Sequence, residues 1–192
     1  HARQRVELII RAALPVGAHV VHRRYAGNGG ESRVPLADHL LIVDGAALLV
    51  LVDGTANSTW SFRARPRLLG EVAALRRERA ELLRRLEAGG ESPPVAVLVV
   101  LARRGGRERA ALTGAIAGAD VRLVLTAELG EALRQWGTAV RRPAAAETSR
   151  ATLWGEQIRA IWTDAAFSMV LCGSGTRPSE PGPDALADVQ QV

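Results

Sequence analysis

The chain has 192 residues, 47% of them apolar, and is therefore long enough to bury one full hydrophobic core. All 25 basic residues are arginine, which with 20 acidic residues gives a net charge of +5 and excludes any chemistry that needs a lysine amine. The single cysteine, Cys172, excludes an intramolecular disulfide and a zinc site made of cysteines. The longest apolar runs fall far below the ~20 residues of a membrane helix and no signal peptide is visible, so we expect a cytoplasmic protein without a membrane partner.

The first part of the chain predicts one helix and then strands. Apolar residues at helical spacing predict a helix over residues 3–14, which ends at Pro15. Strands are expected over residues 18–25, 36–43 and 46–52. The last two strands are joined by Asp44-Gly45, and an Asp-Gly pair between two apolar runs is a strong signal for a hairpin.

The second part predicts helices that alternate with strands. A leucine stripe and an arginine-rich opposite side predict a long helix over residues 66–87. Strands are expected over 95–101 and 121–125, and helices over 107–117 and 126–136, the last with Thr126 as its N-cap. The order α-β-β-β-α-β-α-β-α predicts an α/β fold in which helices flank a mixed central sheet.

The composition changes after residue 142. We therefore expect an α/β domain over 1–142, a linker over 143–151, an amphipathic helix over 152–171 and a disordered tail over 172–192. Trp154, Trp162 and Phe167 recur along that helix. Exposed aromatic side chains at helical spacing suit a groove on a partner protein, so the helix is a candidate docking element.

The order of elements also resembles a known family. The residues that carry the likeness are Arg5-Val6-Glu7-Leu8-Ile9 in the first helix, Ala37-Asp38-His39-Leu40-Leu41-Ile42-Val43 in the first hairpin strand, Pro66 at the start of the long helix, and Thr126-Ala127-Glu128-Leu129 after the last strand. Over roughly residues 3–137 the chain resembles the nuclease-related domain, a bacterial branch of the restriction-endonuclease-like superfamily.

The resemblance implies a metal-dependent phosphodiester hydrolase. Such chemistry requires Mg²⁺ to polarise the phosphate and activate water, and hard carboxylate ligands to hold the ion. By the likeness, Asp38 matches the family's first carboxylate and Glu7 a carboxylate on the first helix. At the family's usual separation from Asp38, Leu51 stands at the position of the second acid and Asp53 at that of the lysine. With a two-residue insertion at the hairpin turn, Asp53-Gly54-Thr55 instead stands where the family has an acid, any residue and a lysine. The implied metal ligands are Glu7, Asp38 and Asp53.

The family's lysine is missing from this pattern. In the alignment with the insertion, Thr55 stands at the position of the lysine, and the chain contains no lysine that could replace it. Arginine carries the charge, but its planar and permanently protonated head is a poor substitute for the lysine amine. The sequence therefore favours a nuclease-related domain whose active site is eroded, acting as a nucleic-acid-binding domain or a regulatory partner.

Two other groups of polar residues bear on function. A metal site made of histidines is disfavoured, because His19 and His22 are three residues apart on an expected strand and point to opposite faces. The arginine side of the long helix is a candidate contact for nucleic-acid phosphates. The residues singled out there are Arg76, Arg77 and Arg84.

Two further hypotheses remain open. The chain could be a working Mg²⁺-dependent nuclease that uses Glu7, Asp38 and Asp53, with Thr55 or an arginine in the role of the lysine. It could instead be a protein-interaction module that binds its partner through the aromatic helix and binds no nucleic acid.

Overall fold

The computed structural model describes residues 2–22, 37–53, 64–86, 92–101, 106–116, 120–141, 145–164, 167 and 171. The elements are α1 (Ala2–Ala13), β1 (His19–His22), β2 (His39–Val43), β3 (Ala46–Asp53), α2 (Ala64–Leu86), β4 (Val95–Leu101), α3 (Gly106–Ile116), β5 (Val121–Leu125), α4 (Leu129–Val140) and α5 (Ala145–Thr163). This order confirms the predicted succession of helices and strands, including the helix predicted after residue 142. Thr55, the end of the strand predicted over 18–25 and the tail predicted over 172–192 lie outside the described residues.

The strands form a mixed five-stranded sheet in the order β1-β2-β3-β4-β5. The first three are antiparallel, whereas β4 and β5 run parallel to β3. The turn between β2 and β3 has positive φ angles at both central residues, 47° at Asp44 and 76° at Gly45, as a tight hairpin requires. The predicted α/β class, the mixed sheet and the hairpin are therefore confirmed.

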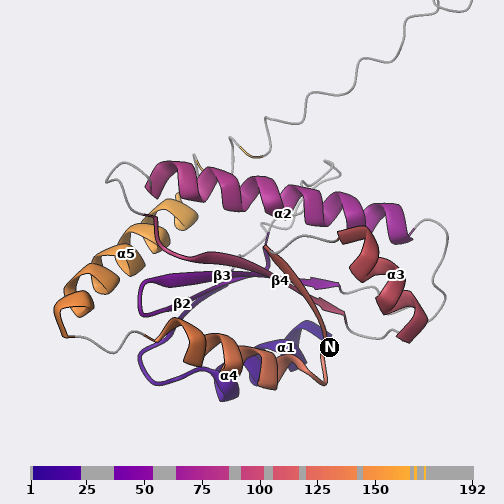
Figure 1. The fold of residues 1–192 in the computed structure, drawn as a ribbon, viewed down its shortest axis with the longest axis horizontal. Coiled ribbons are helices and arrows are strands. Elements are labelled where there is room, and N and C mark those ends of the chain that lie inside the picture. The colour runs from indigo at the N-terminus through magenta and orange to yellow at the C-terminus, as the bar shows by residue number, and fades with distance from the viewer. Residues whose placement is uncertain are drawn as a thin grey trace, which may run out of the picture.

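Helices cover both faces of this sheet in three layers (Figure 1). Helices α2, α3 and α5 pack on one face, and α1 and α4 pack on the other. Both sides of the central strand are consequently apolar, and every residue of β3 is buried. This two-sided burial explains why the sequence of β3 and β4 is continuously apolar rather than alternating.

Helix α5 belongs to the same core as the sheet. Trp154, Trp162 and Phe167 are 7%, 3% and 0% exposed and pack in the cluster under α2. The prediction that these aromatic side chains face a partner protein is therefore wrong, because they cover the chain's own hairpin and long helix. The helix also begins at Ala145, inside the segment predicted as a linker, where alanine-rich sequence favours helix.

The hairpin turn and α5 approach each other at two glycines. A Cβ atom on Gly45 would lie 2.7 Å from the Cα atom of Ala151, and one on Gly155 would lie 3.3 Å from Ile42. Only glycine combines the positive φ of the turn with this backbone approach. The contact fixes α5 across the β2–β3 hairpin.

Helix α4 begins later than the sequence predicts. Its N-cap is Glu128, and the Thr126 hydroxyl instead donates to the carbonyl of Leu101 over 3.2 Å. The prediction of Thr126 as N-cap is wrong because its side chain bonds the end of β4, one strand away. No helix among the described residues combines the length and apolar character needed to span a bilayer.

Candidate functional site

Two histidines face each other across β1 and β2. His22 is the last residue of β1, His39 is the first of β2, and the strand register pairs them directly. Their Nδ1 atoms are 2.8 Å apart, and their rings meet edge to face at 89° with centroids 4.9 Å apart. His39 and Leu41 are two residues apart on β2 and therefore point to the same face of the sheet. Leu41 packs under α1, so the two histidines lie on the face that α1 covers.

Glu7 of α1 completes a cluster with these histidines. Its neighbours Val6 and Ile10 are fully buried against the sheet, while Glu7 itself is half-buried at the flank of that apolar stripe. One ligating atom from each of Glu7, His22 and His39 lies within 4.8 Å of the other two. Two imidazoles and a carboxylate are a ligand set that can hold a divalent transition-metal ion.

Asp38 lies at the entrance of β2 and is not part of this cluster. It is 5% exposed, and its N–H donates to the carbonyl of Val50 over 2.8 Å. Its Oδ2 atom accepts a hydrogen bond of 2.8 Å from the N–H of Val52. The carboxylate thus holds the start of β2 against β3.

Asp53 ends β3 on the side of the sheet away from Glu7. It is 7% exposed and pairs with Leu101 of β4. Its side chain points to the same face of the sheet as those of Leu49 and Leu51, which pack under α2. Glu7 lies with α1 beyond the opposite face. The sheet therefore stands between Asp53 and Glu7, and the structure groups Glu7 with the two histidines rather than with the aspartates.

The buried face of α2 carries a carboxyl group that was not predicted from the sequence to be a site residue. Glu78 is fully buried, and its Oε2 and Oε1 atoms accept hydrogen bonds of 2.8 Å from the N–H of Ala37 and from Nε1 of Trp162. It lies between Leu75 and Leu82 at helical spacing, so a polar residue within the apolar stripe was the available signal. Glu78 links α2, α5 and the segment just before Asp38.

The arginines of α2 are placed differently from one another. Arg76 donates to the carbonyl of Ile116 over 2.8 Å and lies 3.5 Å from Asp120, so it joins α2 to the end of α3. Arg77 and Arg84 are exposed. We define the α2 outer face as the exposed residues within 68–86, the part of this helix whose side chains the structure describes; they are Gly70, Ala73, Arg77, Ala80 and Arg84.

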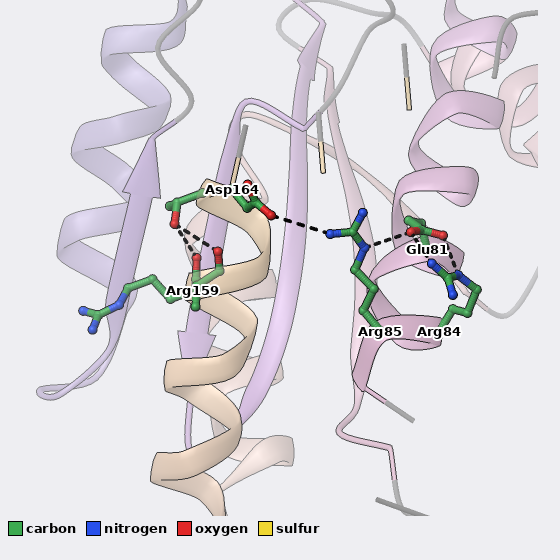
Figure 2. A network of polar contacts seen from close by, with 7 residues as sticks. Glu81, Arg84, Arg85, Arg159 and Asp164 are labelled. Atoms are coloured by element: carbon green, nitrogen blue, oxygen red, sulfur yellow. Dashed lines mark hydrogen bonds and ion pairs between the residues drawn. The ribbon is translucent and has the colours of Figure 1, made fainter. Parts of the chain in front are cut away.

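Glu81 binds two arginines beside the α2 outer face. Its carboxylate is 2.8 Å from Arg84 and 2.9 Å from Arg85, and Arg85 also lies 3.8 Å from Asp164 after α5 (Figure 2). The hydrogen bonds from Arg84 and then Arg85 lower the pKa of Glu81 from 4.5 to about 2. The group is a link between α2 and α5 at the surface.

A cavity of about 370 Å³ lies between α4 and the amino ends of β4 and β5. It is lined mainly by apolar side chains, and Trp136 of α4 forms part of its wall. Ligands of open α/β sheets generally bind at the carboxyl ends of the parallel strands, which is the other end of this sheet. None of the predicted site residues lines the cavity.

Comparison of the chain with protein-family models, with curated proteins and with solved structures gives no match. The functional argument therefore depends on the geometry of the described residues.

Proposed function

We propose that the chain is a nuclease-related α/β domain with an eroded active site, whose role is to bind nucleic acid rather than to cleave it. The observation that carries the proposal is the hydrogen bond from Val52 to Asp38, in a chain that has no lysine. A carboxylate that holds a buried backbone N–H contributes to the stability of the sheet and is a weaker metal ligand, because one oxygen is already engaged.

The element order supports the family part of the proposal. The helix, the three antiparallel strands and the long helix follow one another in the order that the resemblance implies, with Asp38 just before β2 and Asp53 at the end of β3. The mixed sheet between two layers of helices is the class of fold that the resemblance implies. Thr55, which stands where the family has its lysine, lies outside the described residues.

The α2 outer face supports the nucleic-acid part. Its five residues are glycine, alanine and arginine, so a phosphate backbone can approach closely, and the acidic neighbour of Arg84 is Glu81, which is paired with it over 2.8 Å. Arg77 and Arg84 are seven residues apart and therefore point the same way, two turns along the helix. Arginine binds phosphate through two parallel hydrogen bonds, so the absence of lysine does not weaken such an interface.

Binding of a fluorescent DNA or RNA duplex as a function of salt tests this role. The variants are Arg77→Gln and Arg84→Gln, and the control is Arg134→Gln on α4. Arg134 matches Arg84 because the two side chains are 61% and 69% exposed and each is paired with a glutamate three residues earlier. Helix α4 covers the opposite face of the sheet.

Each α2 variant should weaken binding and lower the slope of log affinity against log salt by about 1, while the control leaves both unchanged. Absence of binding at low salt would contradict the nucleic-acid role. An equal loss from Arg134→Gln would show that net charge, and not the α2 outer face, determines the affinity.

A further inference from the structure

We propose that Glu7, His22 and His39 form a binding site for a divalent transition-metal ion of the zinc class. The inference is independent of the nuclease-related assignment, because it uses α1, β1 and β2 residues on the face of the sheet opposite to Asp53. In this site the partners of Glu7 are the two histidines, whereas the family resemblance implies Asp38 and Asp53 as its partners.

The chemistry of the three side chains selects the ion. Imidazole nitrogen is a good ligand for Zn²⁺, Co²⁺, Ni²⁺ and Fe²⁺, whereas Mg²⁺ prefers oxygen ligands and retains several waters. Two histidines and one glutamate provide three protein ligands, which leaves a position for water or a small ligand on a four-coordinate ion. The expected ligand of the cluster is therefore a transition-metal ion and not magnesium.

The backbone holds the three residues in place before any ion binds. The register of β1 and β2 puts His22 and His39 side by side, and the fully buried Val6 and Ile10 fix the rotation of α1 that brings Glu7 to them. Ligand nitrogens bound to a tetrahedral ion at ~2.0–2.1 Å lie about 3.3 Å apart. If both Nδ1 atoms bind the ion, their observed separation of 2.8 Å has to widen only slightly.

The three side chains of the cluster differ in how far they are exposed to solvent, and this difference allows an ion to enter. His39 is 3% exposed, whereas Glu7 and His22 are half-buried. An ion can reach the cluster from the side of the half-buried pair, and the buried histidine limits the water around it. Once bound, the ion would join α1 to the β1–β2 edge and would stabilise the folded chain by mass action.

Calorimetric titration of the full chain with Zn²⁺ and with Co²⁺ tests the site. The reference protein carries His1→Ala, His19→Asn and Cys172→Ser, which removes the other two of the four histidines and the only thiol. Glu7→Gln and His22→Gln are then introduced singly, because both side chains are half-buried and their loss should leave the fold intact. Thermal unfolding without metal verifies that each variant folds.

The reference protein should bind one equivalent of Zn²⁺ as tightly as wild type, and Mg²⁺ in large excess should not displace it. Co²⁺ should give the visible absorption of a four- or five-coordinate ion with nitrogen ligands. Glu7→Gln and His22→Gln should each weaken Zn²⁺ binding by about tenfold or more. Zinc at a hundredfold excess over its Kd for the reference protein should raise the Tm of that protein by about 5–10 °C, and the same zinc concentration should raise the Tm of a variant with tenfold weaker binding by only about half as much.

Zinc binding that disappears in the reference protein would overturn the proposal, because the ion would then depend on the amino-terminal histidine, His19 or the thiol. Affinity that survives Glu7→Gln and His22→Gln within about twofold would overturn it equally. Nuclease activity or its absence does not affect either outcome.

Discussion

The N–H of Val52 inside strand β3 donates a hydrogen bond of 2.8 Å to the carboxylate of Asp38, the residue just before β2. Asp38 in turn donates its own N–H to Val50, so it is bonded to β3 at two points. The residue that the family resemblance marks as a metal ligand therefore has a structural role in the sheet. This relationship makes the stability of Asp38 variants informative about function.

Asp38→Ala should lower the free energy of unfolding by about 1–3 kcal/mol, because it leaves the buried N–H of Val52 without this acceptor. Asp38→Asn should cost less, since the amide oxygen can still accept the bond. Urea unfolding of the two variants measures the difference. A gain in stability from Asp38→Ala would contradict the structural role, because carboxylates kept for metal binding tend to be a source of strain.

The bond between Trp162 and Glu78 predicts an energetic coupling between α5 and α2. Trp162→Phe removes the donor to the buried Glu78 oxygen, and Glu78→Gln changes the acceptor. A double-mutant cycle of these changes should give a coupling energy of about 0.5–3 kcal/mol. Additive effects in urea unfolding would show that this hydrogen bond does not couple α5 to α2.

Gly45→Ala should destabilise the protein far more than Gly17→Ala. Both glycines have positive φ, 76° and 89°, but a Cβ on Gly45 meets the backbone of Ala151 and one on Gly17 meets nothing within 4 Å. The control therefore measures the backbone strain alone, about 1 kcal/mol. Thermal unfolding should show a larger loss for Gly45→Ala, and equal losses would mean that α5 does not pack on the hairpin turn.

Glu81 predicts a dependence of stability on acid. Its pKa falls from 4.5 to about 2 in the folded chain, so its contribution is present above about pH 4.5 and is lost as the pH falls toward 2. The difference in Tm between wild type and Glu81→Gln should therefore be largest at neutral pH and vanish near pH 2.

Glu131→Gln is the matched control for this change. Hydrogen bonds from Arg134 and then Gln135 also lower the pKa of Glu131, but its side chain is 60% exposed, against 15% for Glu81. Solvent screens an exposed pair, so the control should show a smaller dependence on pH. A Glu81→Gln variant whose Tm follows wild type at all pH values would contradict the link.

Local signals in the sequence were enough for much of the fold. Asp44-Gly45 predicted the hairpin turn because few residue pairs adopt positive φ twice, and β4 and β5 have the bounds predicted for them, 95–101 and 121–125. The arrangement of helices on both faces was predicted from the order of the elements and from the continuous apolarity of the segment that forms β4. These features depend on residues close together in the chain.

The candidate metal cluster could not be found in the same way. His22 and His39 become neighbours only through the register of β1 and β2, and that register is not encoded within either strand. His19, the histidine nearest to His22 in the chain, pairs instead with Ile42. Similarly, Trp162 and Phe167 read as an exposed aromatic surface because their partners on α2 lie far away in the chain.

The central claim is that the nuclease-related site no longer cleaves nucleic acid, and a cleavage assay tests it most directly. Wild type and Asp38→Asn are incubated with single- and double-stranded DNA and RNA in the presence of Mg²⁺ or Mn²⁺. We expect wild type to release no more product than Asp38→Asn does. Metal-dependent cleavage by wild type that Asp38→Asn abolishes while the protein stays folded would contradict the account and establish an active nuclease built on Asp38 and Asp53.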